Sequence, residues 1–113
     1  MVLEELRLTV REIVDQLVRG DYEAIVRRCI RSRLTSDDLR KVLHDYGRKL
    51  VSPPGDAYDN LDAVQVQDAS ISKWSIRSPL WTEEEGRSDL TLELTIAVGD
   101  GEPKVELDDL HVL

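Results

Sequence analysis

The stretch Leu90-Thr91-Leu92-Glu93-Leu94-Thr95-Ile96-Ala97-Val98 decides how this chain must fold. Its large apolar side chains occupy every second position, and the positions between them carry Thr91, Glu93, Thr95 and Ala97. Such alternation is typical of a β-strand that packs one face against a core and turns the other face outward. We therefore expect a sheet with one buried face.

Shorter patterns on both sides of this strand predict its neighbours. Residues 64–67 and 74–80 also alternate between apolar and polar side chains. Gly86 and the run Gly99-Asp100-Gly101 mark the hairpins between the strands, because glycine readily adopts turn conformations. With a last strand near the C-terminus, the sheet is expected to be antiparallel and to contain about four strands.

The last strand changes phase partway along. Val105 and Leu107 are in phase with each other, but Leu110 and Val112 are not in phase with them. One extra residue near Asp108-Asp109, a β-bulge, would return the later side chains to the apolar face. We therefore expect a bulge at these aspartates, with Leu110 and Val112 buried.

The first part of the chain carries helical spacing instead. Apolar residues recur on one stripe from Leu3 to Arg19, from Tyr22 to Ile30 and from Leu39 to Tyr46. Gly20 and Asp21 are suited to end one helix and begin the next, so the first two helices should form a hairpin.

The segment Ser52-Pro53-Pro54-Gly55-Asp56 is a loop, because proline and glycine interrupt both periodic structures. It separates a helical half, residues 1–50, from a sheet half, residues 51–113. We expect a single α+β domain, residues 1–113, in which three N-terminal helices pack on one face of the curved antiparallel sheet.

Two resemblances extend this interpretation. The order of the elements, with the Gly20-Asp21 turn, resembles the cystatin-like roll of nuclear-transport-factor-type and SnoaL-type proteins, a fold that serves many functions. The run Leu80-Trp81-Thr82-Glu83-Glu84-Glu85-Gly86-Arg87-Ser88-Asp89-Leu90-Thr91-Leu92 and the end Asp108-Asp109-Leu110-His111-Val112-Leu113 are similar to a group of small, uncharacterised bacterial proteins. Some of these resemble immunity proteins encoded near toxins, which implies an interaction protein and assigns no catalytic residue.

The charge of the chain is unevenly distributed. The net charge is −8, and the excess of acidic residues lies in the sheet half. Such a surface repels nucleic acid and anionic membranes and attracts a basic protein partner, although it also serves solubility alone. We therefore expect neither a nucleic-acid partner nor membrane binding.

The cysteine content and the N-terminus bear on the compartment. Cys29 is the only cysteine, which excludes an internal disulfide and suits the cytosol; its place on a helical stripe predicts a buried, inert thiol. The N-terminal residues lack the regions of a signal peptide, and no apolar run approaches the ~20 residues of a membrane span. A cytoplasmic location is expected.

An acidic hairpin tip is the first candidate binding surface. Glu83, Glu84 and Glu85 are consecutive, and either keep a sheet edge soluble or attract a basic partner. Asp89 and an exposed Trp81 would complete the partner-binding surface, because exposed tryptophan often anchors an interface.

Asp109 and His111 are the only candidates for acid–base catalysis. If the bulge turns both to one side, they would stand together at the mouth of the roll. We assign no metal site and no cofactor: the two histidines, His44 and His111, lie too far apart for a zinc motif, and Cys29 does not complete one.

The leading hypothesis is a non-enzymatic cytoplasmic protein-interaction domain, with an immunity protein as its specific form. The alternative is a small-ligand-binding protein or an acid–base enzyme that uses a cavity between sheet and helices. A third hypothesis is a homodimer that self-associates through the open face of the sheet. An interior cavity lined by polar groups would favour the second hypothesis, and a filled interior with Trp81 exposed would favour the other two.

Overall fold

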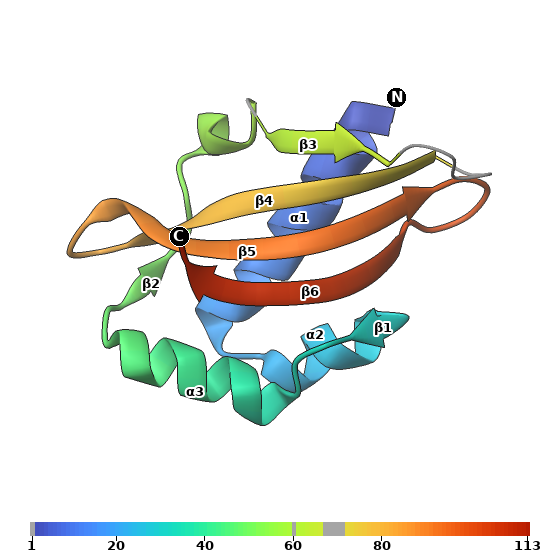
Figure 1. The fold of residues 1–113 in the computed structure, drawn as a ribbon. Helices are drawn as coiled ribbons and strands as arrows, with labels where there is room; N and C mark the ends of the chain where they lie inside the picture. The colour runs from blue at the N-terminus through green and yellow to red at the C-terminus, as the bar shows by residue number, and fades with distance from the viewer. Residues whose placement is uncertain (1, 60, 67–71) are drawn as a thin grey trace.

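The computed structural model describes residues 2–59, 61–66 and 72–113. This part of the chain forms three α-helices, one 3-10 helix and a six-stranded sheet, so the α+β class is confirmed (Figure 1). The elements follow one another as α1 (Val2–Arg19), α2 (Tyr22–Arg28), β1 (Arg31–Ser32), α3 (Ser36–Tyr46), β2 (Leu50–Val51), η1 (Gly55–Tyr58), β3 (Asp62–Gln65), β4 (Ser72–Thr82), β5 (Gly86–Val98) and β6 (Lys104–Val112).

The sheet is larger than the sequence predicted, and it is mixed. The strand order is β1-β6-β5-β4-β2, and β3 pairs with the first part of β4. The expectation of about four antiparallel strands was wrong, because β1 runs parallel to β6 and β2 adds to β4. Both missed strands contain two residues, which is too short for alternation to be visible.

One face of the sheet is covered by α1, which crosses behind β4, β5 and β6 in Figure 1. The apolar side chains of α1 and β5 form one core, and each of the following is at most 2% exposed: Leu6, Val10, Ile13, Leu17, Leu92, Leu94 and Ile96. Burial of this much apolar surface is the main stabilising contribution to a fold of this size. The space between α1 and the sheet is therefore filled.

The expectation that all three helices pack on one face was only partly right. Figure 1 shows α2 and α3 beyond β6, at the side of the sheet. The reason lies in the connection, because α2 leads directly into β1, and the Ile30 N–H donates to the Val105 carbonyl of β6 at 2.8 Å. Ile30, expected on the α2 stripe, is 64% exposed.

Local signals set the helix ends. Gly20 lies between α1 and α2 with a φ of 75°, and Gly47 ends α3 with a φ of 72°, a conformation that costs glycine little. Thr35 and Asp38 form a capping box at the start of α3, in which each side chain accepts from the other residue's backbone N–H.

The predicted bulge is present in β6. Asp109 is the partner of Glu93 and Leu107 is the partner of Leu94, so Asp108 is the extra residue. Leu110 is 2% exposed, as expected. Val112 is 54% exposed, and its predicted burial was wrong, because β1 pairs with β6 only near Glu106 and leaves this end of β6 at the edge of the sheet.

Candidate functional site

The face of the sheet turned away from α1, called here the uncovered face, carries the candidate site. No helix of the described residues lies over it (Figure 1). Neighbours in register share a face, so the successive partners Asp62, Arg77, Glu93 and Asp109 form a polar row across β3, β4, β5 and β6.

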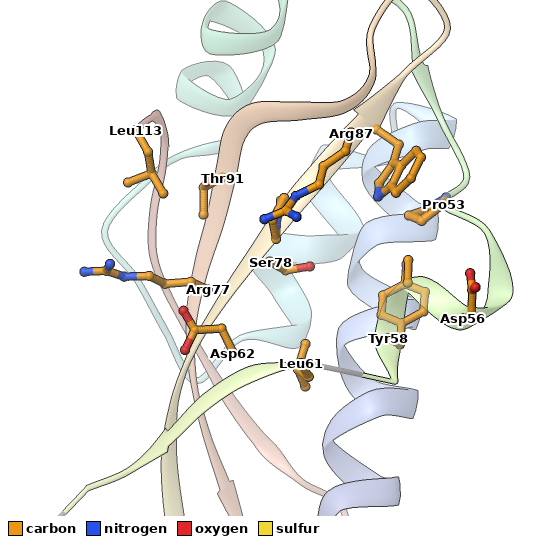
Figure 2. Close-up of a pocket in the computed structure, with 13 residues that line it drawn as sticks. Pro53, Asp56, Tyr58, Leu61, Asp62, Arg77, Ser78, Arg87, Thr91 and Leu113 are labelled. Carbon is orange, nitrogen blue, oxygen red and sulfur yellow. The ribbon is translucent and has the colours of Figure 1, made fainter.

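A pocket of about 520 Å³ opens beside η1 at the edge of β4; we call it the η1 pocket (Figure 2). It exists because β3 pairs with β4 only as far as Arg77 and β2 pairs with β4 only from Trp81 onward, which leaves the residues of β4 between them without a partner strand on this side. Pro79 lies in this gap, where its missing N–H costs no hydrogen bond. The wall includes the apolar or aromatic side chains of Pro53, Ala57, Tyr58, Leu61 and Trp81.

Charged side chains of both signs also line the η1 pocket. They are Asp56, Asp62, Arg77 and Arg87. Figure 2 shows the Arg87 side chain extending into the pocket in the direction of Ser78. Arg77 lies 3.8 Å from a carboxylate oxygen of Glu93, whereas Arg87 forms no ion pair with any residue that the structure describes.

Tyr58 holds an unusual hydroxyl group in the wall of this pocket. The residue is 5% exposed, and its hydroxyl oxygen has no hydrogen-bond partner within the described part of the chain. Burial, with a smaller contribution from Asp15, raises the pKa of Tyr58 to about 12. The Arg11 guanidinium group lies over the ring at 5.4 Å from its centroid.

The hairpin tip that was expected to attract a partner makes contacts with the C-terminal end of α3. Glu85 accepts a hydrogen bond from the Tyr46 hydroxyl at 2.8 Å, and the Arg48 guanidinium group lies 3.4 Å away. The hydrogen bond from Tyr46 is the main cause that lowers the pKa of Glu85, and Thr82, Ser88 and Arg48 act in the same direction.

The other predicted partner-binding residues are dispersed. Glu84 accepts from the backbone N–H of Lys49 at 3.1 Å, and Glu83 lies 3.6 Å from the Lys49 ammonium group. Asp89 is exposed on β5, while Trp81 is part of the η1 pocket. The structure therefore brings the tip glutamates together with basic residues and places Trp81 in a different site.

The other tryptophan of the chain, Trp74, does not line the η1 pocket. Trp74 packs against the core, and its indole N–H donates to the Ser72 hydroxyl at 2.9 Å.

Asp109 and His111 do lie on one side of β6. His111 Nδ1 is 3.7 Å from Asp109 Oδ2, and His111 Nε2 contacts Glu93 Oε2. We call Glu93, Asp109 and His111 the strand cluster. It lies on the uncovered face and not at the mouth of an interior cavity, because the interior is filled by the core.

Sequence reasoning missed Glu93 as a member of the cluster. A signal was available, since Glu93 occupies an outward position of the clearest strand. Finding its partner required the register across the bulge, which sequence alone does not give. The carboxylates and the imidazole of the strand cluster can exchange protons or bind a transition-metal ion.

Cys29 shows no sign of reactivity. The residue is half-buried at the end of α2, and burial raises the pKa of its thiol. A raised pKa lowers the fraction of reactive thiolate at neutral pH.

Within the described residues, no helix combines the length and the apolar character that crossing a bilayer requires.

A family model described as "Domain of unknown function (DUF7668)" matches residues 14–113. The match includes the last third of α1, the whole sheet, the η1 pocket and the strand cluster. No curated protein and no solved structure matches the chain.

Proposed function

The chain belongs to the DUF7668 family, and we propose that it is a non-enzymatic protein-binding domain whose η1 pocket receives an acidic segment of a partner protein. Arg87 carries the proposal, because it lines the pocket and has no ion-pair partner among the described residues. A guanidinium group offers several N–H donors in a plane and binds a carboxylate through two parallel hydrogen bonds.

The wall of the pocket supports the same proposal. Trp81, Tyr58 and Arg87 are of the residue types that most often dominate the free energy of protein–protein binding. The volume of about 520 Å³ lies within the range of ligand pockets, roughly 300–1,000 Å³. Apolar contact with the wall would add to the hydrogen bonds of Arg87.

The enzymatic alternative has weaker support. A catalytic pair needs an enclosed place for its substrate. The strand cluster does not line the η1 pocket, and the space between α1 and the sheet is filled. We therefore favour binding over acid–base catalysis by Asp109 and His111.

A basic partner at the hairpin tip is the second candidate. The side chain of Glu83 is 65% exposed, and the net charge of the chain is −8, both of which favour attraction of a basic surface. Lys49 and Arg48 offset part of the negative charge, so the tip is a weaker site than its sequence suggests. The immunity role, the cytoplasmic location, self-association through the open face and the cystatin-like roll stay predictions, and the proposal rests on none of them.

Selection of a random peptide library on the purified protein tests this function. We expect the retained peptides to be enriched in Asp and Glu beside apolar residues. Arg87→Gln should weaken their binding at least about tenfold, because hydrogen bonds to a charged group contribute roughly 1.5–3 kcal/mol. The matched control is Lys104→Gln, which removes an exposed positive charge of β6 away from the pocket and should leave the affinity nearly unchanged.

Two results would overturn the proposal. Retained peptides rich in Lys and Arg that lose affinity with the double substitution Glu83→Gln and Glu84→Gln would establish the second candidate. Acidic peptides that bind Arg87→Gln as well as the wild-type protein would show that the η1 pocket does not receive them.

A further inference from the structure

The strand cluster gathers three different donor groups in one place. Glu93, Asp109 and His111 each offer a ligand atom, and the three atoms lie within 4.8 Å of one another. The side chains are 24%, 46% and 40% exposed, so they are partly shielded but open to solvent. Ions of the zinc class bind carboxylate oxygen and imidazole nitrogen at about 2.0–2.2 Å, so small side-chain rotations would bring all three atoms to a shared ion.

Each carboxylate of the cluster is oriented by a second contact. Glu93 Oε1 lies 3.8 Å from Arg77 Nε, while Glu93 Oε2 contacts His111. Asp109 Oδ1 accepts the backbone N–H of Leu110 at 2.8 Å, while Asp109 Oδ2 faces His111. In both residues one oxygen is held from outside and the other is directed into the cluster, which is how outer contacts orient ligands around a metal ion.

We propose that Glu93, Asp109 and His111 bind one divalent transition-metal ion of the zinc class on the uncovered face. The imidazole donor favours such an ion over Mg²⁺ or Ca²⁺, which prefer sites made of oxygen alone. Two carboxylates balance the charge of the ion, and three protein ligands leave a further position for water or for a group of a bound partner. The metal site does not depend on the proposed function, because none of the three ligands lines the η1 pocket, although Arg77 lines that pocket and also contacts Glu93.

Titration of the chelator-treated, dialysed protein with Zn²⁺ alone tests the site. Calorimetry should show one ion bound per chain, and the unfolding temperature should rise with Zn²⁺ concentration, because an ion that binds only the folded state stabilises it. Titration with Co²⁺ should produce visible absorption bands of a protein-bound ion. His111→Ala should weaken binding at least about tenfold, since even loss of an outer contact to a ligand costs that much.

The second histidine supplies the matched control. His44 lies exposed on α3, away from the cluster, so His44→Ala should bind Zn²⁺ as the wild-type protein does. Glu93→Gln and Asp109→Asn keep the shape of each side chain, and their circular dichroism spectra report whether the fold is retained. Each should weaken binding in the same direction as His111→Ala.

The alternative is that His111 and the two carboxylates form only an ion-pair network. In that case Zn²⁺ gives neither heat of binding nor a change in unfolding temperature, and the proposal is overturned. Binding that persists unchanged in His111→Ala, or that is lost in His44→Ala, places the ion elsewhere and overturns it equally.

Discussion

The two faces of β5 are built from alternate residues of the same strand, yet they are stabilised differently. On the covered face, Leu92, Leu94 and Ile96 are fully buried against α1 and its neighbours. On the uncovered face, Glu93 contacts His111, and the Thr95 hydroxyl donates to Asp108 at 2.6 Å. Apolar burial has no direction and needs only the correct phase, whereas the polar pairs depend on which residue of the next strand lies opposite.

Shortening one side chain on each face should give the largest contrast. Leu94→Ala removes a fully buried side chain and is expected to lower the free energy of unfolding by about 2–5 kcal/mol. Glu93→Ala removes a partly exposed ion pair and should cost less than about 1 kcal/mol. Urea denaturation monitored by circular dichroism measures both, and equal losses would contradict this account of the two faces.

Removing the hydroxyl group of Tyr46 and that of Tyr58 should change the stability of the protein in opposite directions. The Tyr46 hydroxyl donates a hydrogen bond to Glu85, so Tyr46→Phe should lower the unfolding temperature. The Tyr58 hydroxyl is buried without a partner, so Tyr58→Phe should be neutral or stabilise by up to about 1 kcal/mol. Thermal unfolding of both variants at pH 7 checks the signs.

The pH dependence of Tyr58→Phe provides an independent readout. Burial raises the pKa of Tyr58 from 10.0 to about 12 in the folded protein, so folding favours the neutral phenol. The contribution of the neutral phenol to stability is therefore complete below pH 10. It is lost as the pH rises from about 10 to 12, so the wild-type protein should lose stability over this range compared with Tyr58→Phe. If the variant and the wild-type protein lose stability in parallel over that range, the phenol is not shielded as described.

The smallest expected effect lies at the hairpin tip. The pKa of Glu85 is lowered in the folded protein, chiefly by the Tyr46 hydrogen bond, so the ionised carboxylate stabilises the fold above its unfolded pKa. That contribution is lost as the pH falls through the folded pKa. Glu85→Gln should thus lower the unfolding temperature slightly at pH 7, and the difference should shrink in acid. Glu83→Gln, at a 65% exposed side chain, should change it little at either pH.

Much of the fold could be predicted from sequence periodicity. The spacing of Leu3 to Arg19 and the alternation of Leu90 to Val98 located α1 and β5, because both patterns repeat many times. The bulge at Asp108 was predictable because a phase change must be absorbed somewhere. By contrast, β1 and β2 were not visible, since two residues contain no period and their pairing is decided by distant partners.

The candidate site was less predictable than the fold. Asp109 and His111 were identified because they are close in sequence, but Glu93 joins them only through the register of β5 and β6. The η1 pocket combines Pro53 and Arg87 from separate elements around a gap in strand pairing, which has no local signature. Local chemistry is visible in a sequence, whereas meeting points of distant segments are not.

The extra residue of β6 has a consequence for changes in chain length. Because Leu107 is opposite Leu94 and Asp109 is opposite Glu93, removing Asp108 would join two residues whose partners are already adjacent. Every remaining side chain of β6 would keep its face. Deleting Thr95 would have a different effect, because it lies within continuous pairing of β4 and β5. On one side of the deletion, the buried side chains of β5 would move to the exposed face and the exposed side chains to the buried face. Deleting Asp108 would therefore remove its hydrogen bond with Thr95 but would leave the buried and exposed faces of β6 unchanged.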